Sequence, residues 1–478
     1  MRITEENRPW WTLAGTCMGL FVLMLDSTVV SLALPAIRDD LGASATELQW
    51  VVNGYLLTLA VLVVTAGRLG DMFGRRRVFL VGLVTFAAGL LLAALAPAIE
   101  VLIAARFVQG AGAAGMLTLS LAIVSSVFSD ADRPRAMGIW AGISSMALAV
   151  GPLIGGVLVD ALSWRWVFWI GVPPLVLGLL WTLRAAPESR DEEAGRRVDG
   201  LGLVTLTIGL AGIVLALIEG DEWGWDSGAT LAGIAAGVLG LVAFALVEPR
   251  RRQPIVDFAL FRNRPYLGAS ACAFCLVGSF WAVIFYLPQY LQGPLGHRPA
   301  VSGILLLPIT VPMIVISPPA GRLIARFGVR RLMTVGMACG TAGVALMTRV
   351  DGDGGELTLL PAFLLFGVAL GLVYSPMSIA AMAAMPRSKA GIASGVLAMD
   401  RVLAGAVTLA TTGAIYAALL RDGGGGEQAI PDALSGALWA PAALCAIGTV
   451  LAWLLLQDPQ GDAEATHRHL RHPHAPPH

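Results

Sequence analysis

Hydrophobic residues recur along this chain in long, nearly uninterrupted runs, and short polar segments separate one run from the next. A helix needs about 20 mostly apolar residues to cross the hydrocarbon of a bilayer. Backbone polar groups cannot stay unpaired in lipid, so each run is predicted to be helical. We therefore predict fourteen membrane-spanning helices, at 11–35, 47–67, 78–96, 101–125, 136–159, 166–183, 201–219, 229–247, 267–291, 302–324, 332–348, 358–381, 391–419 and 436–456.

The composition supports a protein of the bilayer. Of the 478 residues, 56% are hydrophobic and 13% are charged, whereas soluble proteins carry about twice that charge. Lys+Arg number 32 and Asp+Glu also number 32, so no basic excess is available to neutralise the phosphates of a nucleic acid. This composition excludes a disordered chain and an ordinary soluble enzyme, and it argues against a nucleic-acid partner.

The five cysteines all lie inside apolar runs and are expected to be small buried hydrophobic residues. Cys272 and Cys275 have the CxxC spacing, but no second pair and no nearby His accompany them. The spans hold no nucleophile–base pair and no metal-ligand cluster. We therefore predict no enzyme activity, no catalytic residue, no bound metal and no organic cofactor.

Arginine is concentrated in alternate connections between the predicted spans. The segments 75–77 and 250–252 are runs of arginine, whereas connections on the opposite side hold single residues such as Arg38 and Arg298. Loops rich in Lys and Arg stay in the cytoplasm. This asymmetry predicts that both termini are cytoplasmic, with a short tail at 1–10 and a His-rich, solvated tail at 458–478.

A segment between spans 2 and 3 recurs between spans 10 and 11. Residues 67–77 and 321–331 share Gly, Arg, Leu, Phe, Gly, Arg and Arg at matching positions. Parallel repeats of this kind are typical of transporters. They predict an N-terminal six-helix half at 11–185 and a C-terminal six-helix half at 266–457, with spans 7 and 8 and cytoplasmic linkers at 186–265.

The first copy of the repeat contains candidate residues for a conformational latch, namely Gly67, Asp71, Gly74, Arg75 and Arg76. Glycine permits a close turn, and arginine anchors helix ends at the membrane interface. Asp71 could pair with a nearby arginine and latch one half against the other in one conformation. In the second copy Ala325 replaces this aspartate, so the latch would be one-sided. The alternative is that these charges only set the topology.

Two carboxylates lie well inside predicted spans, where a charge is costly and usually functional. At 1.5 Å per residue, Asp26 is about 22 Å from the cytoplasmic end of span 1, and Arg106 is about 8 Å below the outer surface in span 4. In a hydrocarbon core of about 30 Å these depths coincide, so the two side chains could face each other. We interpret them as a proton-coupling pair, because water access can decide the protonation of such a carboxylate. The alternative is a static ion pair that fixes helix packing.

Two further features of the spans are candidate functional sites. Asp400 lies near the middle of span 13 and is either a second proton or cation site or a carboxylate satisfied by a neighbouring Tyr, Ser or backbone group. Gly151, Pro152, Gly155 and Gly156 in span 5 could provide a bend and a tight contact that prevents leakage. The alternative for span 5 is ordinary close packing of helices.

The chain is identified as a member of the major facilitator superfamily, and it resembles the fourteen-helix drug:proton antiporter branch. Five segments carry the resemblance, and in chain order they are Leu25-Asp26-Ser27-Thr28-Val29-Val30-Ser31-Leu32-Ala33-Leu34-Pro35, the loop segment 67–77, Arg106-Phe107-Val108-Gln109-Gly110-Ala111-Gly112, Gly151-Pro152-Leu153-Ile154-Gly155-Gly156 and Trp164-Arg165-Trp166-Val167-Phe168-Trp169-Ile170-Gly171-Val172-Pro173. The chain departs from the family pattern at Ser31 and Gly171, where Asn is usual, and at Asp400, where a small polar residue is commoner.

The resemblance implies an all-α integral membrane protein with two six-helix halves and two linker helices. It also implies a multidrug efflux antiporter of the bacterial cytoplasmic membrane. The expected substrates are small, lipophilic and in part cationic, the proton is the coupling ion, and the expected state is a monomer in the bilayer. The alternative function is a self-resistance exporter of one natural product. A membrane receptor is disfavoured, because the loops are too short to form a sensory domain.

Overall fold

The computed structural model describes residues 4–129, 132–190, 199–251, 254–349, 355–385, 390–424 and 429–457. The predicted His-rich tail at 458–478 and part of the predicted linker, at 191–198 and 252–253, lie outside the described residues. The described parts of the chain contain α-helices and two short 3-10 helices, and no strand. An all-helical fold is therefore confirmed for these residues.

The described chain consists mainly of helices. They are α1 (Arg8–Leu41), α2 (Ala45–Phe73), α3 (Arg75–Ala94), α4 (Ile99–Val127), α5 (Arg133–Ala161), α6 (Trp166–Trp169), α7 (Val172–Ala185), α8 (Gly200–Trp223), α9 (Gly228–Val247), η1 (Glu248–Arg250), η2 (Phe258–Arg262), α10 (Arg264–Gln292), α11 (Pro299–Leu305), α12 (Leu307–Ile316), α13 (Ala320–Phe327), α14 (Val329–Met347), α15 (Gly355–Ala383), α16 (Ala390–Asp422) and α17 (Ile430–Leu455).

Every predicted span overlaps with helical structure, although the spans at 166–183 and 302–324 are interrupted, and the count of fourteen spans is not confirmed. By length and composition, twelve helices of the described chain could cross a membrane, or up to thirteen if the bent pair α11 and α12 is one span. Helix α14, which covers the predicted span 332–348 except for its last residue, is not among them. A fourteenth span therefore stays a prediction.

The predicted span at 302–324 is not one straight helix. Helix α11 ends at Leu305, and α12 continues after a bend of 42°. Pro308 lies in the first turn of α12, where its missing N–H costs nothing but its ring clashes with the preceding turn. Helix α12 ends just before Pro318 and Pro319, which cannot continue its hydrogen-bond ladder. The hydrophobic run predicted the helical state correctly, but the prolines divide it.

The two copies of the sequence repeat form the same kind of turn. Gly74 separates α2 from α3 with a φ of 112°, and Gly328 separates α13 from α14 with a φ of 80°. A positive φ is strained for residues with a side chain, so both turns require glycine. The equivalence supports two related halves, whereas the exact domain boundaries stay predictions.

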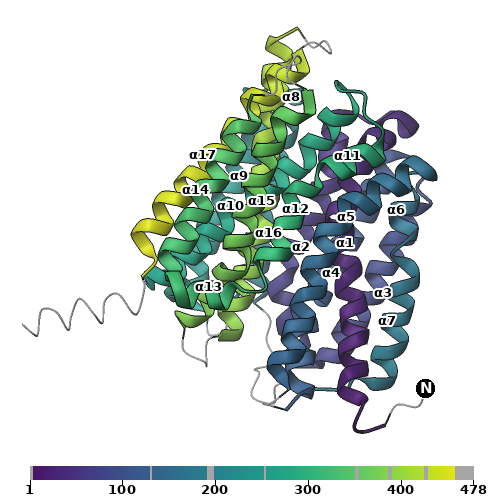
Figure 1. Ribbon diagram of the computed structural model, residues 1–478, viewed down its shortest axis with the longest axis vertical. Coiled ribbons are helices and arrows are strands. Elements are labelled where there is room, and N and C mark those ends of the chain that lie inside the picture. Colours follow the sequence, from purple (N-terminus) through teal and green to yellow (C-terminus); the bar gives the residue numbers. More distant parts are fainter. Residues whose placement is uncertain are drawn as a thin grey trace, which may run out of the picture.

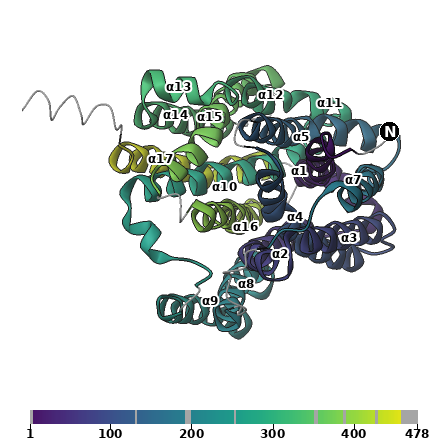
Figure 2. The same cartoon turned by 90° about the horizontal axis from the view of Figure 1, so that it is seen from below.

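Helices α1 to α7 pack together on one side of the molecule, and α10 to α17 pack together on the other (Figures 1 and 2). Helix α8 lies beside α2 and α16, with α9 on its outer side (Figure 2). We call the end that carries the N-terminus and the α2–α3 turn the proximal end. The opposite end, which carries the α1–α2 turn and α11, is the distal end (Figure 1).

Candidate functional site

A buried ion pair joins α1 to α4 inside the N-terminal half. The guanidinium of Arg106 donates to the Asp26 carboxylate over 2.6 Å, and each side chain is only 2% exposed. Helix α1 runs from the proximal to the distal end and α4 starts at the distal end, so the two residues reach the same depth from opposite directions. The contact that the helix depths suggested is thus present, although its role in proton coupling stays a prediction.

A polar shell fixes both members of this pair. Arg106 also donates from Nε to the Val51 carbonyl over 2.8 Å and from Nη1 to Gln109 Oε1 over 3.0 Å. Gln109 in turn donates from Nε2 to the second carboxylate oxygen of Asp26 over 3.3 Å. The Arg106 guanidinium lies over the Tyr55 ring, 4.5 Å from its centroid. Because Arg106 has acceptors besides Asp26, neutralising the carboxylate would not leave the guanidinium without hydrogen bonds.

Sequence reasoning missed Gln109 as a member of this site. It lies three residues after Arg106 in the quoted span 4 motif, so both project from one face of α4. That spacing was the signal. Gln109 is fully buried and contacts both charged groups. The site is therefore a triad of Asp26, Arg106 and Gln109.

Asp400 lies on α16 in the C-terminal half and is half-buried. Its carboxylate accepts a hydrogen bond from the Ser270 hydroxyl of α10 over 2.8 Å. Of the partners left open by the sequence, serine is the one found. The adjacent Arg401 lies near the Tyr374 ring instead, 5.7 Å from its centroid. Asp400 thus has a polar neighbour, and its role as a proton or cation site stays a prediction.

The predicted latch residues lie at the proximal turn between α2 and α3. Asp71 pairs with Arg75 across this turn over 2.9 Å. A Cβ at Gly67 would lie 2.7 Å from Thr118 of α4, so glycine permits close packing there. This ion pair joins two residues of the N-terminal half, and the latch between the two halves stays a prediction.

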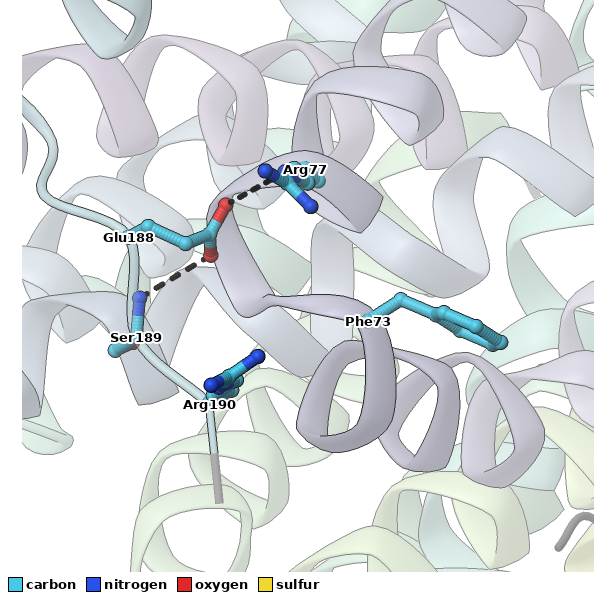
Figure 3. Close-up of a pocket in the computed structure, with 5 residues that line it drawn as sticks. All are labelled: Phe73, Arg77, Glu188, Ser189 and Arg190. Carbon is cyan, nitrogen blue, oxygen red and sulfur yellow. Dashed lines mark hydrogen bonds and ion pairs between the residues drawn. The ribbon is translucent and has the colours of Figure 1, made fainter. Parts of the chain in front are cut away.

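Glu188, which lies just after α7, contacts the turn between α2 and α3. This residue was not identified from the sequence. Its carboxylate accepts from the backbone N–H of Arg76 over 3.0 Å and lies 3.7 Å from the Arg77 guanidinium. Figure 3 shows Glu188 between Arg77 and Ser189, at the edge of a pocket of about 360 Å³. No local pattern marked this contact, because its partners are far apart in the sequence.

The glycines of α5 allow two close helix contacts. A Cβ at Gly155 would lie 2.7 Å from the Val29 carbonyl of α1. On another face, a Cβ at Gly156 would lie 3.0 Å from the carbonyl carbon of Pro299 in α11. Gly151 faces Thr28, whose hydroxyl donates to the Leu148 carbonyl over 3.2 Å. Helix α5 is continuous through Pro152, and the role of this segment in preventing leakage stays a prediction.

The two halves touch at the distal end. Arg298 pairs with Asp160 over 2.9 Å, and Gln292 donates to the Leu32 carbonyl over 3.1 Å. The structure therefore describes a conformation that is closed at its distal end.

Comparison with known proteins identifies relatives over nearly the whole chain. The multidrug resistance protein Stp of Mycobacterium tuberculosis is 35% identical over 410 residues, which cover 86% of this chain and 76% of that protein. The tetracenomycin C resistance and export protein of Streptomyces glaucescens is 35% identical and covers 93% and 80%. The puromycin resistance protein pur8 of Streptomyces alboniger is 34% identical and covers 96% and 94%.

Solved structures show the same fold at low sequence identity. A D-xylose-proton symporter superposes with a TM-score of 0.66 at 15% identity, over 94% of this chain and 98% of that one. The family model described as Major Facilitator Superfamily matches residues 16–409. The curated relatives of this multi-span family are transporters and resistance proteins. The chain therefore belongs to the Major Facilitator Superfamily.

Proposed function

We propose that the protein is a proton-coupled antiporter that exports lipophilic, in part cationic, drugs across the bacterial cytoplasmic membrane. One relative is a multidrug efflux pump and another is a tetracenomycin C resistance and export protein, which supports a role in drug export. The proximal end faces the cytoplasm in this proposal, consistent with the arginine distribution. The described conformation, closed at the distal end, would then receive substrate from the cytoplasm. The protein works as a monomer, with the proton as its coupling ion and no other cofactor.

The buried pair of Asp26 and Arg106 is the observation that carries the proposal. An ion pair that is 2% exposed contributes little net stability, because desolvation offsets the attraction between the charges. A proton that reaches Asp26 from outside removes one of the two charges. The interaction between α1 and α4 then depends on protonation, which ties proton binding to the conformation of the N-terminal half.

The test measures dye accumulation in inside-out vesicles with an acidic lumen. The wild-type protein is expected to concentrate a cationic dye inside and to lose it when a protonophore collapses the gradient. Asp26→Asn is expected to remove this accumulation while it still binds the dye in detergent. Asp39→Asn, on the exposed end of the same helix, is the matched control and should behave as the wild type. Wild-type accumulation by Asp26→Asn would contradict proton coupling at this residue.

Asp400 is expected to set the preference for cationic substrates. A carboxylate attracts a cation strongly where the effective dielectric constant is low. Asp400→Asn should reduce efflux of a cationic dye by about tenfold, which corresponds to about 1.4 kcal/mol, and should spare a neutral dye of similar size. Ser270→Ala keeps the charge and removes only the hydrogen bond, so its effect should be smaller. An equal loss for both dyes with Asp400→Asn would refute this role.

A dedicated self-resistance exporter is the second candidate. It is favoured by relatives named for single antibiotics, namely tetracenomycin C and puromycin. A panel of structurally unrelated drugs in a host that lacks its own pumps distinguishes the two. Resistance to many compounds supports the multidrug exporter, and resistance to one chemical class supports the dedicated one.

A further inference from the structure

Helices α8 and α9 form an additional pair outside the two six-helix halves. We propose that this pair is a distal clasp: α8 binds one helix of each half at the distal end and thereby favours the distally closed conformation. This assigns a conformational role to the two linker helices. It does not depend on proton coupling.

The pair moves as one body, because its helices approach each other at glycines. A Cβ at Gly212 would lie 2.6 Å from the backbone nitrogen of Gly237, and a Cβ at Gly240 would lie 2.5 Å from that of Gly209. Backbone atoms cannot give way as side chains can, so the two helices are in direct contact over more than one turn. A force on α8 is therefore transmitted to α9.

The opposite side of α8 is an apolar face. Leu206, Leu210, Val214 and Ile218 recur every four residues and are buried. Residues at this spacing lie along one side of a helix. Helix α8 packs beside α2 of the N-terminal half and α16 of the C-terminal half (Figure 2). It thus spans the line along which the halves meet.

Two acidic side chains at the distal end of α8 bind the two halves, one side chain to each half. Glu219 accepts a hydrogen bond from the indole N–H of Trp50 in α2 over 2.6 Å. Trp50 is itself stacked on Phe107 of α4, with ring centroids 6.1 Å apart, which anchors it in the N-terminal half. Asp221 forms an ion pair with Arg421 in the last turn of α16. One turn of α8 therefore bridges the two halves.

The seam between α2 and α16, beside this bridge, opposes closure. Gln49 is 5% exposed and is pressed against Gly413. Among the described residues, no hydrogen-bond partner is found for Gln49 Oε1 or for Thr412 Oγ1. Buried polar atoms without partners favour a state in which water reaches them. Water can hydrate these polar atoms when the seam between α2 and α16 opens, which favours the open state. Contacts such as those of α8 are therefore needed to keep the seam closed.

Breaking the clasp should therefore shift the protein toward a distally open conformation. The Asp26–Arg106 pair is left intact by such a change, since neither clasp residue contacts it. The shift is measured as the reactivity of a cysteine introduced by Ser302→Cys. Ser302 is fully buried on α11, the helix that contacts α5 of the other half. A membrane-impermeant thiol reagent added to the distal side reacts with this thiol only when that side opens. The same protein without Ser302→Cys gives the background from the five natural cysteines.

In the protein that carries Ser302→Cys, the double substitution Glu219→Gln and Asp221→Asn is expected to raise the labelling rate roughly fivefold or more. Asp226→Asn is an exposed change on the same hairpin and should leave the rate unchanged. Gly156→Ala, which forces α5 away from α11, is the positive control for opening. Trp50→Phe keeps an aromatic ring and removes the N–H donor, so it should raise the rate even if the double variant fails to fold.

The proposal is overturned if the clasp variants label no faster than the parent while Gly156→Ala does, or if Asp226→Asn accelerates labelling equally. Labelling is measured without substrate and without a proton gradient. A failure of the clasp is therefore distinguishable from a failure of proton-coupled export.

Discussion

Arg106→Met is expected to abolish transport and to destabilise the folded protein by about 3–5 kcal/mol. The substitution leaves the Asp26 carboxylate buried without its counter-ion, and of its two donors among the described residues the Gln109 amide remains. An uncompensated buried charge is far more costly than the loss of the pair as a whole. Thermal unfolding in detergent measures the stability, and dye accumulation in vesicles measures transport.

A second variant separates the structural from the functional role of the pair. Asp26→Asn combined with Arg106→Met removes both charges, so most of the lost stability should return. Transport driven by the proton gradient should stay absent, because no carboxylate remains to bind the proton. Recovery of both properties would mean that the pair only fixes helix packing. If the stability does not return either, the loss of stability in Arg106→Met does not arise from the unpaired charge.

The contact between Asp26 and Arg106 could be predicted because it depends on few quantities. Helix rise is constant, the limits of the two spans are set by apolar runs, and charges in lipid seek partners. Depth along the membrane follows from these quantities. Gln109 was within reach of the same reasoning, since its spacing from Arg106 places both on one helix face.

Contacts that depend on how helices are rotated and placed could not be predicted in this way. Glu188 follows α7 but accepts a hydrogen bond from the backbone of the α2–α3 turn, and Arg421 of α16 pairs with Asp221 of α8. The sequence gives the depth of each residue but not the neighbours of its helix. The proline breaks around α12 show a further limit, because hydropathy alone does not register a missing N–H.

Gly156→Ala is expected to reduce drug transport by about 5- to 150-fold, because it disfavours the distally closed conformation. The added methyl would lie 3.0 Å from the carbonyl carbon of Pro299 and 3.1 Å from Ala300 Cα, which are backbone atoms of the other half. Overpacking of this kind costs about 1–3 kcal/mol, which corresponds to that range in the equilibrium between the two conformations. Initial rates of dye efflux from cells with matched protein levels measure the loss.

Gly142→Ala is the matched control, since it makes the same change on the same helix where no described atom lies within 4 Å of the new methyl. It should transport as the wild type does, or slightly better if alanine stabilises α5. Because the clash at Gly156 exists only while the distal end is closed, Gly156→Ala should keep its thermal stability and lose turnover. Equal losses in the two variants would show that α5 responds to any added volume, and that contact with α11 is not what distinguishes Gly156.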